Sequence, residues 1–125
     1  MFRKICIAGA CLFAVGCYYD SQEALYNNVT PVPCDTTNIT YTGRIATIIK
    51  DNCSSCHSST SGPLQGNGVI LDNFAGLQQQ AANGKLMGDI NQSPGFNAMP
   101  LSGNRLSSCD IGAIQHWVNM GIPNN

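Results

Sequence analysis

The chain has 125 residues, of which 43% are hydrophobic and 10% are charged, and its formal net charge at pH 7 is −1. All seven acidic residues follow residue 16, whereas two of the six basic residues precede it, so the later part is mildly acidic. This charge argues against a nucleic-acid partner, because phosphate backbones are bound by clustered Lys and Arg. The length suits one small domain.

The first sixteen residues predict an export signal. Arg3 and Lys4 form a basic region, and the uncharged, mostly apolar run 5–16 is too short to span a bilayer. Small residues then precede Cys17, as in the bacterial lipobox, so we expect 1–16 to be a lipoprotein-type signal peptide and Cys17 to carry lipid. Such a lipid anchor would hold the protein on a membrane of the cell envelope, at the periplasmic face or the outer membrane. Two alternatives stay open: lipid on Cys11, or ordinary cleavage that leaves Cys17 without a role.

The next segment predicts a tether and then a helix. Residues 17–33 are polar, contain two prolines and have no lasting apolar period, so we expect a flexible tether followed by a folded domain over 34–125. A first helix is predicted from about Gly43 to Asp51, with apolar side chains at i, i+3 and i+4 and with Thr42 as its cap.

This helix leads into the motif Cys53-Ser54-Ser55-Cys56-His57. Two thiols three residues apart, with a histidine directly after the second, are typical of covalent attachment of c-type haem. In that chemistry the two sulfurs bind the two vinyl groups of one porphyrin, and the histidine is the proximal iron ligand. A bare CxxC also occurs in redox dithiols and in zinc sites. A dithiol gives His57 no role, and no second CxxC or HxxxH pair completes a zinc tetrahedron.

Two further helices are predicted, and no strand is. A middle helix begins near Asp72 or Asn73 and ends by Gly84, with a short turn through Leu86 to Ile90 after it. The last helix has a capping pattern from Ser107, and its expected buried stripe is Ile111, Ile114, Trp117 and Val118. We expect Trp117 to pack this helix against the first.

A second iron ligand is predicted in the loop before the last helix. Met99 precedes a proline in a stretch rich in Gly and Pro, where neither a helix nor a paired strand is expected. A thioether favours ferrous iron, so a His/Met pair raises the reduction potential. Met87, Met120 and His116 are less well placed, and an open sixth position is the remaining alternative.

These features resemble the class I cytochrome c family, and more closely the small monohaem cytochrome c lipoproteins of bacterial envelopes. The resemblance runs from about residue 35 to 122 and rests on the haem motif, on Met99-Pro100 and on the closing helix. It implies a small all-α fold, with three main helices and long loops around one covalent haem c. It also implies that the Pro63 carbonyl accepts the Nδ1 proton of His57. The chain departs from the family in having no lysine cluster, which leaves the partner open.

Two cysteines remain after the others are assigned. Cys6 and Cys11 leave with the signal, which leaves Cys34 and Cys109 to pair in an oxidising compartment. Such a bridge closes a loop of about 75 residues and is worth roughly 4.5 kcal/mol on the chain-entropy model. Two buried reduced thiols are the alternative.

The function expected from the resemblance is that of an electron carrier and not of an enzyme. A six-coordinate iron exchanges single electrons with other redox proteins of the envelope in transient encounters. The alternative is a haem sensor or a peroxidase-like domain in which Met99 dissociates, although no His, Asp or Glu lies between Gln92 and Arg105. The side chains expected to line the haem slot are Leu64, Ile70, Leu71, Phe74, Ile90 and Phe96.

Overall fold

The computed structural model describes residues 34–125, and within this range the chain forms helical segments and no strand. The expected all-α class is therefore confirmed for this part. In chain order the elements are η1 (Tyr41–Ile45), α2 (Ala46–Asn52), α3 (Ser54–His57), α4 (Gly62–Gln65), α5 (Phe74–Ala82), α6 (Lys85–Ile90) and α7 (Ser108–Asn119). The predicted signal 1–16, Cys17 and the tether 17–33 lie outside the described residues. No helix in 34–125 is long and apolar enough to cross a membrane.

The first predicted helix is present as η1 followed directly by α2. Its cap is Thr40 and not Thr42, because the Thr40 Oγ1 accepts a hydrogen bond from the Gly43 N–H at 3.1 Å. The Thr42 hydroxyl instead donates to the Asn125 carbonyl at 2.9 Å, which joins the end of the chain to the start of this helix. The isoleucines at 45, 48 and 49 are buried, as their spacing predicts.

The middle helix also follows its sequence signals. Asn73 caps α5 by accepting a hydrogen bond from the Gly76 N–H at 2.9 Å. The helix ends before Gly84, whose φ of 78° lies in the left-handed region that favours glycine. The short turn expected through Leu86 and Ile90 is a helix, α6, and both of these side chains are buried.

The last helix, α7, packs through an aromatic cluster. Trp117 is fully buried, and its ring lies 6.2 Å from that of Tyr41 and 6.5 Å from that of Phe74. Its indole N–H donates to the Pro123 carbonyl at 2.9 Å, so the polar atom is paired. Since Tyr41 belongs to η1, Trp117 does pack the last helix against the first.

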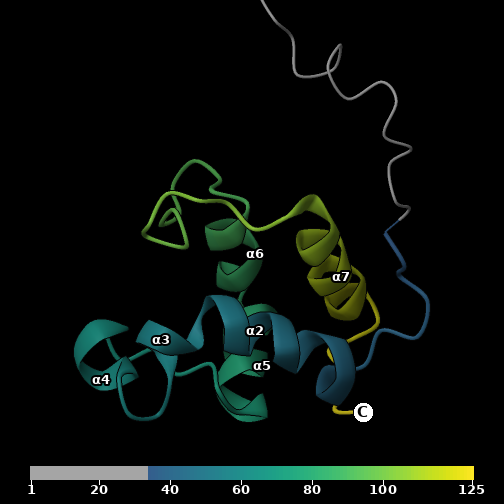
Figure 1. Ribbon diagram of the computed structural model, residues 1–125, viewed down its shortest axis with the longest axis horizontal. Helices are drawn as coiled ribbons and strands as arrows, with labels where there is room; N and C mark the ends of the chain where they lie inside the picture. Colours follow the sequence, from purple (N-terminus) through teal and green to yellow (C-terminus); the bar gives the residue numbers. More distant parts are fainter. Residues whose placement is uncertain (1–33) are drawn as a thin grey trace, which may run out of the picture. The chain divides into compact units, whose positions relative to one another are not determined.

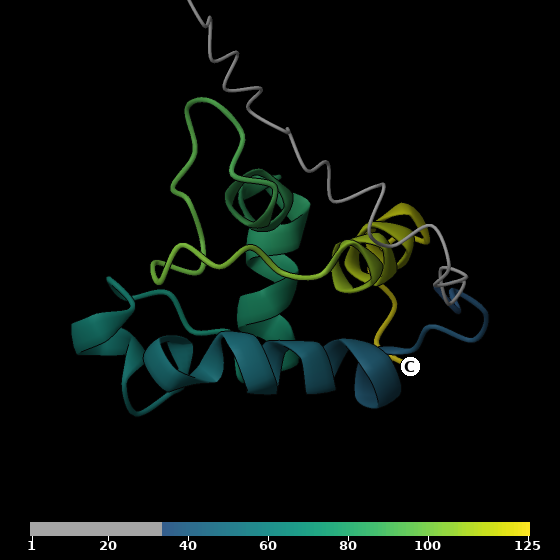
Figure 2. The same ribbon diagram turned by 45° about the horizontal axis from the view of Figure 1, so that its top comes forward.

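The short helices and the longest loop gather at one end of the domain. Figures 1 and 2 show η1, α2, α3 and α4 following one another along one side, with α5 crossing them and α6 and α7 on the other side. The long loop between α6 and α7 lies at the same end as α3 and α4, away from α7. The core of buried isoleucine, leucine and tryptophan side chains lies between the helices. Cys53, Cys56 and His57 lie at the α2–α3 junction and in α3, and Met99 lies in the long loop after α6.

Candidate cofactor-binding site

One cavity of about 510 Å³ brings together the four residues that the sequence singles out as haem ligands and attachment points. Cys53, Cys56 and His57 line it from the α2–α3 junction, and Met99 lines it from the loop after α6. The other lining residues are Asn52, Ser55, Gln65, Gly66, Asn67, Val69, Leu71, Gln80, Lys85, Leu86, Asp89, Ile90, Asn97, Pro100, Leu101, Ser102 and Leu106. The volume lies within the range of about 300–1,000 Å³ that is usual for small-molecule and cofactor sites.

A single helical turn places the three motif side chains on this cavity. The Cys53 N–H donates to the Ile49 carbonyl at 2.8 Å, which makes Cys53 the C-cap of α2. The Cys53 carbonyl then accepts hydrogen bonds from the N–H groups of Cys56 and His57, at 3.2 and 2.9 Å. Residues at i, i+3 and i+4 share one face of a helix, so both sulfurs and the imidazole are presented together.

The orientation of His57 is fixed by the loop that follows it. Its Nδ1 atom lies 3.1 Å from the Val69 carbonyl oxygen, and its own carbonyl accepts from the Leu71 N–H at 2.7 Å. When Nδ1 carries the proton and donates it to this carbonyl, Nε2 keeps its lone pair for a metal.

The carbonyl that lies beside His57 Nδ1 belongs to Val69 and not to Pro63, so the role expected for Pro63 is wrong. Pro63 is exposed, at the second residue of α4, a position where proline is favoured because its missing N–H has no helical partner. The chain turns back toward His57 only after this helix, through left-handed residues at Asn67 and Gly68. The carbonyl that reaches the imidazole therefore comes from a later residue.

Gly66 is a site residue that the sequence reasoning missed. A Cβ atom at this position would lie 2.7 Å from both the Cys56 carbonyl oxygen and the His57 Nδ1 atom, and 2.9 Å from the Val69 carbonyl oxygen. Any side chain would therefore collide with the group that orients the imidazole. The only signal in the sequence was the density of glycine after the motif, which does not say which glycine is required.

Met99 is half-buried and is held by the end of α6. The Met99 N–H donates to the Asp89 carbonyl at 3.1 Å, and the Asn97 N–H donates to the Asp89 Oδ1 atom at 3.0 Å. The rival ligands do not line the cavity: Met87 packs against the core, whereas Met120 and His116 are exposed at α7. Of the four candidate ligands within residues 34–125, which are Met87, Met99, Met120 and His116, Met99 is thus the one that lines the cavity with His57.

The thiols are not in the environment of a redox dithiol or of a zinc centre. Burial raises the pKa of the Cys53 thiol to about 11, whereas reactive dithiols have a nucleophilic cysteine with a lowered pKa. A cavity of this volume is also far larger than the closed tetrahedral shell that a structural zinc ion requires. Both cysteines are half-buried and unpaired in the described structure.

The expected lining of the slot is correct in part. Leu71 and Ile90 line the cavity, together with Val69, Leu86 and Leu106, which were not predicted. Leu64 is 91% exposed, and Ile70 does not line the cavity. Phe74 lies in the aromatic cluster instead, with its ring 5.0 Å from that of Tyr41. Phe96 packs on Gly88, where no Cβ intervenes.

Cys34 and Cys109 are joined in a disulfide, and their Cα atoms are 5.2 Å apart. This separation is within the range of 4.4–6.8 Å that such a bond requires. The bridge ties the start of the described chain to the first turn of α7. Neither cysteine lines the cavity.

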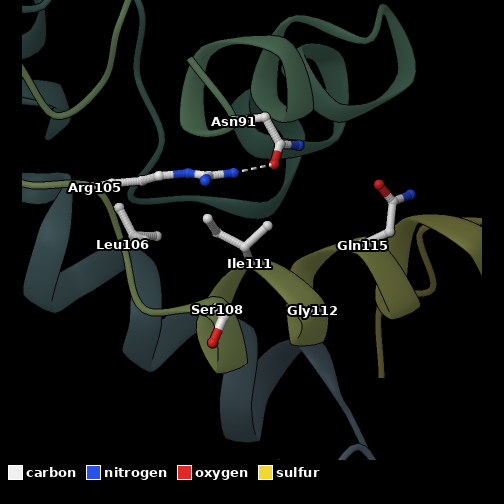
Figure 3. Close-up of a pocket in the computed structure, with 7 residues that line it drawn as sticks. All are labelled: Asn91, Arg105, Leu106, Ser108, Ile111, Gly112 and Gln115. Atoms are coloured by element: carbon white, nitrogen blue, oxygen red, sulfur yellow. Dashed lines mark hydrogen bonds between the residues drawn. The ribbon is translucent and has the colours of Figure 1, made fainter. Parts of the chain in front are cut away.

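A second, smaller cavity of about 310 Å³ lies between the end of α6 and α7. It is lined by Asn91, Arg105, Leu106, Ser108, Ile111, Gly112 and Gln115 (Figure 3). The Arg105 Nη2 atom donates to Asn91 Oδ1 at 2.9 Å, which links the two ends of the loop that carries Met99. Leu106 lines both cavities.

Comparison with protein-family models, with curated proteins and with solved structures finds no match to this chain.

Proposed function

We propose that this chain is a membrane-tethered monohaem c-type cytochrome, with a fold like that of the class I cytochromes c, that passes single electrons between redox proteins of the cell envelope. The observation that carries the proposal is the cavity that collects Cys53, Cys56 and His57 from one helical turn and Met99 from a distant loop. Thiol, imidazole and thioether groups on one largely apolar cavity are the set that covalent, six-coordinate haem requires.

The residues present fit this cofactor. Cys53 and Cys56 would form the two thioether bonds, and His57 would bind iron through Nε2 while the Val69 carbonyl holds Nδ1. Met99 would be the sixth ligand. Gly66 leaves room for the close approach of the Val69 loop to the imidazole, which a Cβ atom would fill. Bound haem would supply one iron that exchanges a single electron.

The chain's own residues would then tune and shield that iron. Leu71, Leu86 and Ile90 are buried side chains on the cavity wall, and they would keep water from the porphyrin. A neutral His/Met pair in such surroundings favours the reduced state and gives a high potential. If His57 and Met99 both bind the iron, no open position would be left for a substrate, so we propose a carrier and not an enzyme.

Partners would meet the protein at the mouth of the cavity. Leu101 lines the cavity and is 77% exposed, so an apolar side chain stands at its rim. A small, weakly charged contact of this kind suits the brief encounters of electron-transfer proteins. Lipid on Cys17, which lies outside the described residues, would keep the carrier at the membrane surface.

The alternative function, a haem sensor or peroxidase-like domain, is favoured by one observation. Asp89 lines the cavity close to Met99, so a carboxylate is present where the sequence showed none between Gln92 and Arg105. One of its oxygens, however, accepts the Asn97 N–H. The carrier requires Met99 to stay bound, whereas the sensor requires it to leave.

Absorption spectra of the oxidised and reduced protein test the carrier. A ferric thioether bond gives a weak near-infrared band, which we expect in wild type and in Met87→Ala and not in Met99→Ala. The variant Met99→Ala should also have a lower reduction potential while keeping its haem. A wild-type protein without the band that binds carbon monoxide rapidly when reduced would favour the sensor. If the band disappears in Met87→Ala and persists in Met99→Ala, the ligand is Met87 and the proposal for Met99 is wrong.

A further inference from the structure

We propose that Asp89 is a positioning residue for Met99: its carboxylate and its main-chain carbonyl together hold the Asn97–Met99 segment against the cavity. This inference rests on the proposed function of Met99 as sixth ligand. It assigns a role to an acidic residue of α6 that no sequence motif singled out. The role is exerted through the backbone of the loop, because the Asp89 Oδ1 atom and the Asp89 carbonyl accept hydrogen bonds from backbone N–H groups of the loop.

Two hydrogen bonds fix the loop on either side of a single residue. The Asp89 Oδ1 atom accepts from the Asn97 N–H at 3.0 Å, and the Asp89 carbonyl accepts from the Met99 N–H at 3.1 Å. The two contacts therefore bracket Ala98 and leave the backbone of Met99 little freedom to rotate. The direction in which the Met99 side chain leaves the loop is set by this anchoring, and Met99 and Asp89 line the same cavity.

The rest of the loop offers few other ties at this point. Phe96 N–H donates to the Ser93 carbonyl, and Gly103 N–H donates to the Pro100 carbonyl, both at 3.1 Å, so these are turns within the loop itself. The far end is held by the Arg105 to Asn91 hydrogen bond of 2.9 Å. In the described structure Asp89 is thus the residue of α6 that reaches the segment between these turns.

The position of Asp89 in its helix supports a role outside the helix. It is the second-last residue of α6, and a carboxylate in the last turn is disfavoured by the negative end of the helix dipole. Acidic residues are favoured in the first turn instead. The charge finds its compensation in the loop, where a hydrogen bond from a backbone N–H to a carboxylate is stronger than one to a neutral acceptor.

A methionine ligand is sensitive to such anchoring because the iron–thioether bond is weak and competes with external ligands. Loss of a hydrogen bond to a charged group lowers the equilibrium constant between the ordered and the released loop by about tenfold or more. We therefore expect imidazole, used as the probe, to displace Met99 from the ferric protein about tenfold more readily in Asp89→Ala than in wild type. The variant should keep one covalent haem per chain.

Two control variants separate the possible causes. Asp89→Asn keeps an acceptor oxygen for the Asn97 N–H without the charge, so its imidazole affinity should stay within about threefold of wild type. Gln78→Ala removes an exposed polar side chain of α5 that does not line the cavity, and its imidazole affinity should not change. If Asp89→Asn behaved like Asp89→Ala, the hydrogen-bonding role would be overturned in favour of charge.

A second measurement does not depend on haem. Hydrogen exchange of the Asn97 amide should be slow in the wild-type chain and about tenfold faster in Asp89→Ala. Unchanged exchange would overturn the tether itself, and faster exchange with unchanged imidazole affinity would overturn the positioning role. A wild-type protein with no thioether band would overturn the proposed ligand Met99 and the positioning role with it, whatever the exchange rates show.

Discussion

Replacement of Gly66 by alanine tests how closely the loop after the haem motif must approach His57. The added Cβ would lie 2.7 Å from the Cys56 carbonyl oxygen and from the His57 Nδ1 atom. Ordinary van der Waals contact begins at 3.4 Å, so these groups must separate by about 0.7 Å. The backbone itself is not the obstacle, because the φ of Gly66 is −93° and alanine adopts negative φ values freely.

The expected cost follows from this collision. Forcing extra atoms into a packed region costs about 1–3 kcal/mol in the free energy of unfolding. For a domain of this size, each kcal/mol lowers the midpoint of thermal unfolding by about 4–8 °C. The shift would also lengthen the contact of 3.1 Å between His57 Nδ1 and the Val69 carbonyl, so we expect the reduction potential to change as well.

Gly112→Ala is the matched control. Apart from the neighbouring residues and the backbone of its own helix, no atom lies within 4 Å of the place its Cβ would occupy, and the residue is inside α7. Alanine should therefore stabilise the fold by about 0.5–1 kcal/mol, since glycine is unfavourable within a helix. Thermal unfolding followed by circular dichroism compares the two variants. A Gly66→Ala protein as stable as wild type, with an unchanged potential, would refute the steric argument.

Two further predictions concern stability. Cys34→Ser with Cys109→Ser should lower the free energy of unfolding by up to about 4.5 kcal/mol on the chain-entropy model, and with it the midpoint of thermal unfolding. The reduction potential should stay almost unchanged because neither cysteine lines the cavity; a large change in potential would contradict this. Hydrogen bonds from the Ser59 N–H and hydroxyl lower the pKa of Asp72 below 3.8, so its contribution to stability is complete above that pH and is lost as the pH falls through the lowered value. Asp72→Asn should thus have a lower free energy of unfolding than wild type at pH 7, and this difference should shrink as the pH falls below about 3.8. Urea unfolding at a series of pH values measures it, with the exposed Asp51→Asn as control. A difference in stability that does not depend on pH would contradict the role of the Asp72 charge.

The sequence predicted what depends on local periodicity. The buried isoleucines of η1 and α2, Leu77 of α5 and Ile114 and Trp117 of α7 repeat at helical spacing, and the three helices predicted from that spacing lie where it placed them. The motif of two thiols and a histidine is local as well, because a single turn brings its side chains together. These features needed no knowledge of the rest of the chain.

The parts that could not be predicted depend on the paths of loops. Whether Pro63 or Val69 reaches the His57 ring is decided by where the chain reverses after α4. Phe74 was expected at the cavity, but Tyr41, which is distant in sequence, draws it into the aromatic cluster. Asp89 was overlooked because its partner, the Asn97 N–H, is a backbone group that no sequence pattern marks. Each of these is a tertiary contact to a loop.

Covalent attachment of haem is tested most directly by the mass of the intact chain, purified from cells that attach c-type haem and then extracted with acid-acetone. Thioether bonds survive this treatment, so we expect the mass of the wild-type chain to exceed that of the variant Cys53→Ser with Cys56→Ser by that of one haem. Cys53→Ser with Cys56→Ser should lose the haem completely, whereas Cys34→Ser with Cys109→Ser should keep it. A wild-type chain that leaves its haem in the solvent, or never contains any, would contradict covalent attachment of haem at Cys53 and Cys56.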